Sequence, residues 1–144
     1  MRQVLGDVAA HTWVVEFQKR GLPHIHILLI FKNHHKPQSP NDYDRLVCAE
    51  IPDPHLFPDL HNAIKSHNIH GPCGHLNPKC KCMENGKCKY DFPKQFNNQT
   101  KSTESGYPLY RRRENGTQID IKGIMMDNRS VVAYNPYLSQ KVTK

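Results

Sequence analysis

Two apolar runs near the N-terminus form the clearest pattern in the chain. The first covers residues 13–17, interrupted only by Glu16, and the second covers residues 25–31. The six residues between them, 18–23, are polar or basic except for a leucine, and they include a glycine and a proline, which is a composition typical of a turn. The pattern predicts a β-hairpin of two buried strands.

A second hairpin is predicted in the C-terminal half. Residues 106–113 and 117–121 alternate apolar and polar positions on either side of Asn115-Gly116, and Asn-Gly is a favoured two-residue hairpin turn. The nine residues before it, 97–105, have the polar composition of a linker.

Helical patterns are weaker and lie between the two predicted hairpins. Residues 43–51 fit either a short strand or a short helix, and residues 56–67 fit a helix. Asp53 precedes Pro54, a residue suited to a first helical turn, so we expect the helix to be capped there. These elements together predict an α+β fold, an antiparallel β-sheet core with flanking helices.

The composition limits the class of protein. A chain of 144 residues has room for one domain, and a net charge of +7 suits a polyanionic partner. The chain has no secretory leader pattern and no apolar stretch long enough to span a membrane, so we expect an intracellular, nuclear or otherwise non-secreted protein. An odd number of cysteines, five, favours metal ligation over a disulfide framework.

The first candidate site lies at the start of the second apolar run. His24 and His26 are two residues apart, so in a strand they share one face and lie about 6.6 Å apart at Cα, close enough to bind one metal ion. Glu16 and Gln18 leave the first strand just before the turn, and either one can supply a third, oxygen ligand. The alternative is that both histidines are hydrogen-bonded core or edge residues.

The second candidate site is the loop of residues 67–88. This loop is rich in Gly, Pro, Asn and Lys and has almost no apolar residues, so it needs another source of order, which a structural zinc ion supplies. His70 and Cys73 form one plausible pair of ligands, and Cys82 and Cys88 form the other. The alternative is a disordered basic loop with free thiols.

Basic residues near these sites are candidates for contacts to single-stranded DNA. Lys87, Lys89 and Lys94 are interleaved with aromatic residues, a combination that suits phosphate pairing and base stacking. The same role is predicted for Lys19, Arg20, Arg111, Arg112 and Arg113. The alternatives are a solvated edge and a charged edge strand that resists aggregation.

The segment from Glu16 to His26, EFQKRGLPHIH, resembles the signature of Helitron transposon Rep-type nucleases, a branch of the His-hydrophobic-His endonucleases. AEIPDP, GYPLYRRR and DNRSVVAYNPYL also resemble Helitron sequence, as do the patterns HxxHGPCG and CMxxGKC in the loop. The two loop patterns imply zinc ligands drawn from five residues: His67, His70, Cys73, Cys82 and Cys88. Cys80 stands where the resemblance implies a residue other than cysteine. By this resemblance the chain is one partial Rep nuclease-like domain, residues 1–144, and Gln18 is the favoured third ligand.

The resemblance implies a metal-assisted reaction on single-stranded DNA. A tyrosine hydroxyl attacks a phosphodiester, the Mg²⁺ or Mn²⁺ ion on the histidines orients the phosphate, and the enzyme becomes covalently attached to the DNA. The family places the tyrosines on a helix after Asn-Pro-Tyr-Leu, and the six residues 139–144 contain none. Tyr134 and Tyr137 remain candidates, but Asn135-Pro136 predicts an extended segment between them. We therefore expect a truncated fragment without the helicase domain of a complete transposase and without nicking activity of its own.

Two other functions remain open at this stage. One is a non-catalytic module that binds zinc and single-stranded DNA. The other is a metal-dependent hydrolase that activates water, for which Glu16 is the nearest candidate base.

Overall fold

The computed structural model describes residues 6–17 and 23–142. The chain divides into two compact units, Met1–Gln38 and Ser39–Lys144, and the single Rep-like domain stays a prediction. Each unit is described separately below.

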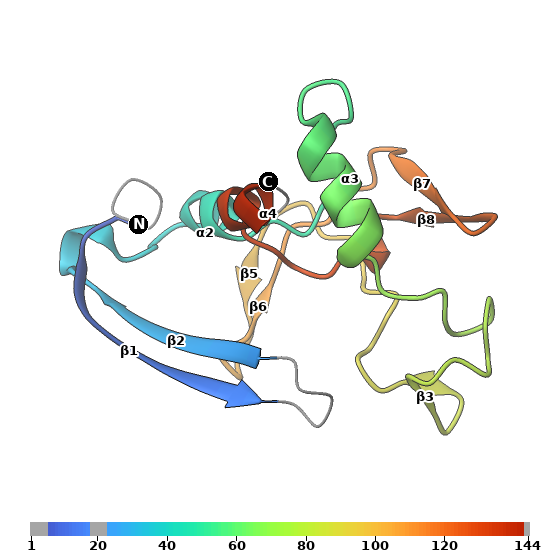
Figure 1. Cartoon of the computed structure of the whole chain (residues 1–144), viewed down its shortest axis with the longest axis horizontal. Helices are drawn as coiled ribbons and strands as arrows, with labels where there is room; N and C mark the ends of the chain where they lie inside the picture. The colour runs from blue at the N-terminus through green and yellow to red at the C-terminus, as the bar shows by residue number, and fades with distance from the viewer. Residues whose placement is uncertain (1–5, 18–22, 143–144) are drawn as a thin grey trace. The chain divides into compact units, whose positions relative to one another are not determined.

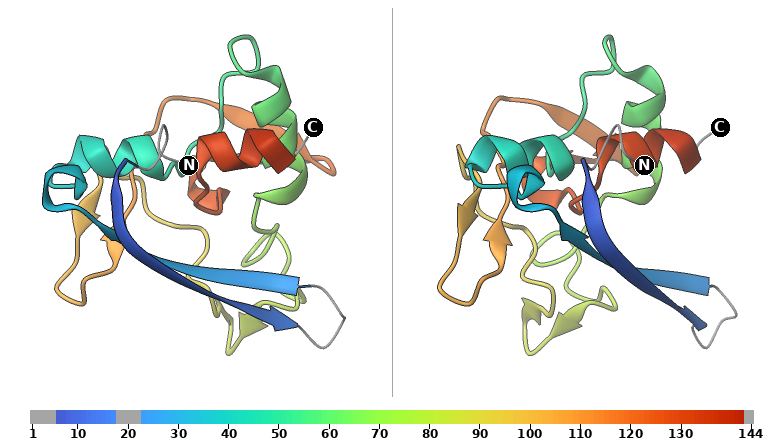
Figure 2. Two further views of the ribbon diagram at one scale, coloured as in Figure 1. Left: turned by 60° about the vertical axis from the view of Figure 1, so that its left-hand side comes forward. Right: turned by 90° about the vertical axis from the view of Figure 1, so that its left-hand side faces the viewer.

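The first unit contains the predicted N-terminal hairpin. Strands β1 (Val8–Phe17) and β2 (Pro23–Phe31) pair antiparallel and form one twisted ribbon (Figures 1 and 2), followed by the 3₁₀-helix η1 (Asn33–His35). Trp13 pairs with Ile27 and Glu16 pairs with His24.

The hairpin is confirmed, but the prediction that its strands are buried is wrong. Trp13 is 60% exposed and Ile27 is 49% exposed. A two-stranded ribbon that is apolar on both faces needs a packed layer on each side to bury them. The described residues of this unit add only a short 3₁₀-helix to the hairpin.

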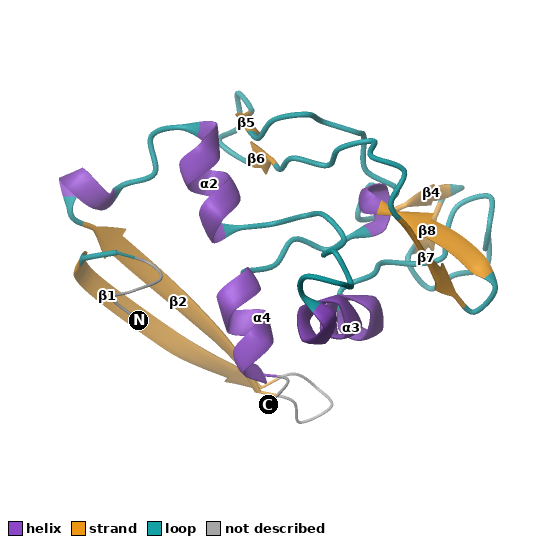
Figure 3. Cartoon of the chain, turned by 90° about the horizontal axis from the view of Figure 1, so that it is seen from above, coloured by secondary structure: helices purple, strands orange, loops and turns teal. Residues whose placement is uncertain are grey.

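The second unit is built from short elements joined by long loops (Figure 3). Its helices are α2 (Pro40–Leu46), α3 (Pro58–His67), the 3₁₀-helix η2 (Asn128–Ser130) and α4 (Pro136–Val142). Its strands form antiparallel pairs: β3 (Met83–Glu84) with β4 (Lys87–Cys88), β5 (Lys101–Ser102) with β6 (Pro108–Leu109), and β7 (Gln118–Ile121) with β8 (Ile124–Asp127). The α+β class is confirmed, although the described strands form two-stranded sheets, so a continuous Rep-type sheet stays a prediction.

One apolar core holds the second unit together. Isolated β-bridges join Cys48 to Tyr134 and Ile69 to Val131, which bring distant segments of the chain together around this core. Ile64 and Val131 are completely buried. The core consists of Ile51, Leu60, Ile64, Ile119, Met126, Val131 and Tyr134.

Helix α3 begins later than the sequence suggested. The Asp53 carboxylate accepts hydrogen bonds from the backbone N–H groups of His55 and Leu56, at 2.7 and 3.3 Å. These are the hydrogen bonds of a helix N-cap, and Phe57 N donates to Asp53 O at 2.9 Å, so residues 53–57 form one capped turn as expected. The turn does not continue directly into α3, which begins at Pro58.

The second predicted hairpin does not form. Strand β7 pairs with β8, and β6 pairs with β5, which lies within the predicted linker 97–105. Lys122 and Gly123, with φ of 55° and 83°, connect β7 to β8, and such positive φ values at both central residues define a type I′ hairpin turn. Asn115 uses its side-chain oxygen to accept hydrogen bonds from Thr117 N and from Asn128 Nδ2. The prediction of a hairpin turn at Asn115-Gly116 is therefore wrong.

The C-terminal segment is helical where an extended segment was predicted. Pro136 opens α4, because proline is tolerated in a first turn, and Asn135 Oδ1 accepts a hydrogen bond from Leu138 N at 2.9 Å. Tyr137 therefore lies on a helix, and Tyr134 lies just before it.

Candidate metal centre

The ligand-bearing loop begins where α3 ends. Ile69 bridges Val131, and the backbone N–H of His70 donates to Ser130 O at 2.8 Å, so His70 is fixed against the core. Cys73 follows in the same loop, and its Sγ lies 3.8 Å from Phe92 O.

The β3–β4 hairpin positions the other two cysteines. Met83 pairs with Cys88, and the backbone N–H of Lys89 donates to Cys82 O at 2.9 Å. The turn between the strands contains Asn85 and Gly86, both with positive φ, which permits a tight reversal. Cys82 and Cys88 are therefore held on the two sides of one short hairpin.

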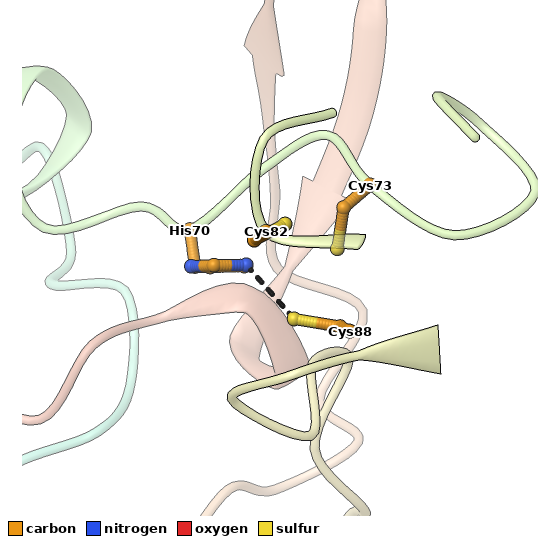
Figure 4. A group of neighbouring side chains, drawn as sticks. All are labelled: His70, Cys73, Cys82 and Cys88. Atoms are coloured by element: carbon orange, nitrogen blue, oxygen red, sulfur yellow. Dashed lines mark hydrogen bonds between the residues drawn. The ribbon is translucent and has the colours of Figure 1, made fainter. Parts of the chain in front are cut away.

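Four side chains from these segments point toward one another (Figure 4). The ligand atoms of His70, Cys73, Cys82 and Cys88 all lie within 4.8 Å of one another, and His70 Nε2 is 3.3 Å from Cys88 Sγ. Zinc binds tetrahedrally at about 2.0–2.3 Å from nitrogen and sulfur, so the ligand atoms around one ion lie roughly 3.3–3.8 Å from each other. The described cluster has the ligand set, Cys₃His, of a structural zinc site and can hold a metal such as zinc.

The surroundings of the cluster favour metal ligation. The three cysteines are buried, and the His70 ring stacks on the Phe92 ring with centroids 4.2 Å apart and planes at 15°. Burial and the positive charge of Lys94 lower the pKa of His70, which keeps the imidazole neutral, as a metal ligand must be. Burial, together with hydrogen bonds to the neighbouring thiols, raises the pKa of Cys82 to about 12. A thiol with a raised pKa loses its proton only when a nearby cation stabilises the thiolate, and a bound zinc ion would do this.

Two loop residues stand apart from the four-ligand group. His67 is exposed at the C-terminal end of α3 and is not part of the cluster. Cys80 is partly exposed, and its Sγ lies 3.4 Å from Cys82 Sγ. The structure thus brings together four of the five predicted zinc ligands and adds a neighbouring thiol. The cysteines in the described part of the chain form no disulfide.

The histidine pair lies on one face of the first hairpin. Glu16 is directly opposite His24 in the register, and Glu16 Oε2 is 3.1 Å from His26 Nε2, with both side chains exposed. The predicted oxygen donor is therefore adjacent to the pair. Gln18, the other candidate ligand, lies outside the described residues, as do Lys19 and Arg20. Binding of a divalent ion here stays a prediction.

Sequence reasoning missed a second grouping in the first unit. Ligand atoms of Asp7, His34 and His35 lie within 4.8 Å of one another. His35 Nδ1 already accepts a hydrogen bond from Asp7 N at 3.0 Å, and Lys32 Nζ is 3.9 Å from the Asp7 carboxylate. The signal available in the sequence was the adjacent histidine pair, but nothing there connected it to Asp7.

The loop lysines are grouped with aromatic side chains. Lys89 Nζ lies 5.0 Å from the Tyr90 ring centroid, and Lys94 Nζ lies 5.1 Å from that of Phe92. Lys87 and Lys89 are exposed, whereas Lys94 also donates to Tyr90 O at 2.7 Å. This is the interleaving of charge and rings that the sequence predicted.

The arginine run has a largely structural position. The Arg112 guanidinium is buried and its Nη1 donates to three backbone carbonyls, at 2.6 Å for Val131, 2.7 Å for Asn128 and 3.3 Å for Ala49. Burial lowers its pKa to about 10. The interior position of Arg112 argues against the predicted phosphate contact.

The two neighbouring arginines pair with one buried and one half-buried acid that the sequence analysis did not single out. Arg113 binds both carboxylate oxygens of Glu50, at 2.9 and 2.7 Å, and Arg111 Nη1 lies 3.1 Å from Asp44 Oδ2. Burial alone would raise the pKa of Glu50, but hydrogen bonds and charge from Arg113, with a contribution from Arg111, outweigh it and lower the pKa. Both positive charges are thus partly neutralised within the protein.

The two candidate tyrosines differ in accessibility. Tyr134 is 6% exposed, its hydroxyl donates to Glu50 O at 2.9 Å, and burial raises its pKa. Tyr137 is 41% exposed on α4, with Lys141 Nζ 5.4 Å from its ring centroid. The geometry of Tyr134 is that of a core residue.

The fold and its Cys₃His cluster define an α+β protein with a candidate zinc centre. In a comparison with protein families, residues 1–29 match the family described as the Helitron helicase-like domain at the N-terminus. This confirms the resemblance to Helitron proteins for the stretch that contains His24 and His26, and it supports a Helitron-related domain. No curated protein matches the chain. Among the described residues, no helix is both long and apolar enough to cross a membrane.

Proposed function

We propose that this chain is a Helitron-related domain that binds single-stranded DNA, with a structural zinc ion held by His70, Cys73, Cys82 and Cys88. The observation that carries the proposal is the convergence of these four ligands from two segments of a loop with little apolar material. Bound zinc supplies a cross-link between the two segments. Two contacts within the protein hold His70 in place: its backbone N–H donates to Ser130 O, and its ring stacks on Phe92.

The proposed DNA-binding surface is the segment that follows the last ligand. Tyr90 is 54% exposed and lies beside Lys89, so a base can stack on the ring while the ammonium group pairs with a phosphate. Zinc at Cys88 would fix the start of this segment, since Asp91 N donates to Cys88 O at 2.9 Å. Lys87 adds a further exposed charge. The site therefore couples metal binding to presentation of the DNA-binding residues.

A second candidate function is DNA nicking at the first hairpin. Glu16 contacts His26 and pairs with His24, so one carboxylate and two imidazoles lie near one another within the stretch that matches the Helitron family. A divalent ion there would polarise a phosphodiester. Glu16 and the two histidines would hold the ion. Of the two candidate tyrosines, Tyr137 is exposed and Tyr134 is buried.

The zinc site is tested by elemental analysis of protein purified without chelator. We expect close to one zinc per chain, lost in Cys73→Ser and in Cys82→Ser. Cys48→Ser is the matched control, because Cys48 is a half-buried cysteine beside Glu50 O and outside the cluster. Equal zinc content in all four proteins would contradict the proposal.

The DNA surface is tested by fluorescence anisotropy with labelled single-stranded DNA over a range of salt. Lys89→Ala should weaken binding and reduce the slope of log affinity against log salt by about 0.7, the value for one contact to a single strand. Tyr90→Ala should weaken binding with little change in slope. Lys101→Ala and Tyr107→Ala are matched controls, because both residues are exposed and lie in or beside the separate β5–β6 pair. Equal losses in the controls would refute the proposed surface.

A time course with single-stranded DNA and Mg²⁺ or Mn²⁺ on a denaturing gel separates the functions. DNA that is bound but not cut supports the binding module. A covalent protein–DNA adduct supports attack by a tyrosine, and cut DNA without an adduct supports attack by water. We expect retention without adduct, because the Tyr134 hydroxyl is engaged in the core. An adduct that disappears in Tyr137→Phe and in His26→Ala would establish the nuclease instead.

A further inference from the structure

A fifth thiol lies next to the candidate zinc site and has no place in its four-ligand group. Cys80 Sγ is 3.4 Å from Cys82 Sγ, and only Lys81 separates the two cysteines in the chain. Cys80 is partly exposed, whereas Cys73, Cys82 and Cys88 are buried, at 6–8% exposure. An oxidant arriving from solvent therefore meets Cys80 first.

We infer that Cys80 is an oxidation site that opens the metal centre: a hydroperoxide oxidises Cys80, a disulfide forms between Cys80 and Cys82, and the zinc ion is released. This inference rests on the proposed zinc site. It adds to that proposal a chemical condition under which the site gives up its metal.

The reaction balances in two steps. The Cys80 sulfur attacks one oxygen of hydrogen peroxide, the O–O bond breaks, and Cys80 becomes a sulfenic acid while one water leaves. The Cys82 thiolate then leaves zinc and attacks the Cys80 sulfur, an S–S bond forms, and the sulfenic hydroxyl leaves as hydroxide, which takes a proton from solvent to give a second water. The two cysteines together lose two electrons, one peroxide is reduced to two waters, and zinc remains Zn²⁺ throughout.

The position of the two sulfurs explains why this pair reacts. Because they are already in contact, the second step is intramolecular and needs no large movement of the loop. The backbone N–H of Met83 donates to Cys80 O at 2.8 Å, which holds the two cysteines in one turn. A disulfide sulfur is a poor zinc ligand, so the reaction leaves only His70, Cys73 and Cys88.

Loss of the metal should also affect the proposed DNA surface. Cys88 and Tyr90 lie in the segment that the zinc site would fix, so oxidation should weaken binding of single-stranded DNA together with zinc release. Reduction by a thiol, followed by added zinc, should restore both, because a disulfide is reversed by thiol exchange.

The test compares wild-type protein with Cys80→Ser, each loaded with zinc and treated with hydrogen peroxide. A zinc-binding dye follows release, and mass spectrometry of the peptide that contains residues 80 and 82 detects the loss of two hydrogen atoms. We expect rapid release and the disulfide in the wild type, and severalfold slower release without it in Cys80→Ser. Cys48→Ser, which alters a cysteine outside the cluster, should behave as the wild type.

The outcomes distinguish this inference from the proposal on which it rests. Equal release rates in wild type and Cys80→Ser, with both proteins fully loaded at the start, would overturn the inference and leave the zinc site intact. Reduced zinc content in Cys80→Ser before oxidant is added would overturn it too, because Cys80 would then be a ligand. Absence of zinc from the reduced wild-type protein would refute the zinc site itself.

Discussion

The buried amide of Asn128 should be one of the most sensitive positions in the second unit. Asn128 is 1% exposed, and its side chain makes three hydrogen bonds. Oδ1 accepts from Ile51 N at 2.8 Å, and Nδ2 donates to Arg113 O at 2.8 Å and to Asn115 Oδ1 at 3.2 Å. One amide therefore joins three separate segments of the chain.

The cost of removing this amide follows from the partners that it leaves. Asn128→Ala leaves the Ile51 N–H and the Arg113 carbonyl without this partner, and each buried group left unsatisfied costs about 1–3 kcal/mol. We expect the free energy of unfolding to fall by about 2–6 kcal/mol. At about 4 °C per kcal/mol, the melting temperature should fall by roughly 8 °C or more.

A second variant isolates the donor half of the amide. Asn128→Asp keeps an oxygen for Ile51 N but turns a second oxygen toward two acceptors, Arg113 O and Asn115 Oδ1. It should therefore also destabilise the protein although its shape is almost unchanged. Urea unfolding followed by circular dichroism measures both variants against Asn98→Ala, an exposed asparagine. Values for both Asn128 variants within about 0.5 kcal/mol of the control would refute the reasoning.

Three further predictions concern acid, metal and packing. The pKa of Glu50 is lower in the folded than in the unfolded protein, so its ionised carboxylate stabilises the fold fully above the unfolded pKa, and this stabilisation is lost as pH falls through the folded pKa. In Glu50→Gln, the free energy of unfolding measured from pH 7 to pH 3 should therefore fall less steeply with acid. Removing zinc with a chelator should speed amide hydrogen exchange in residues 70–93 and leave α3 protected; equal acceleration in both would contradict a local structural role. Ile64→Ala should lower the free energy of unfolding by about 2–5 kcal/mol, against under 1 kcal/mol for the exposed Leu76→Ala.

The sequence was informative where one local pattern decides the structure. The N-terminal hairpin follows from two apolar runs around a turn, and the metal cluster follows from cysteines and a histidine in a loop without apolar residues. Spacing pairs His70 with Cys73 and Cys82 with Cys88, and these are the four residues of the cluster, whereas the additional His67 came from the family resemblance. The spacing does not show what holds His70 in place, which is the bridge between Ile69 and Val131 just before it.

The predictions that were wrong share a different cause, which is that residues distant in sequence bind the groups on which the local pattern relied. Asn115-Gly116 has the composition of a hairpin turn, but the Asn115 oxygen is taken by Asn128, and the chain reverses at Lys122-Gly123 instead. Arg112 lies in a basic run that indicates a surface, yet its guanidinium satisfies carbonyls from two other segments. Such partners are set by tertiary structure, which no local window of sequence contains.

The isolated bridges of the second unit have a consequence for how fast it folds. The hydrogen bond from Tyr134 to Glu50 joins residues 84 apart in the chain, and that from Asn135 to Leu46 joins residues 89 apart. Contacts of such long sequence separation must overcome the entropy of closing large loops before they gain any energy, and they are associated with slow folding. Because the helices are short and the sheets have two strands each, few local contacts can form beforehand. Refolding of this unit should therefore be slow for its size, with its segments assembling together late in the reaction.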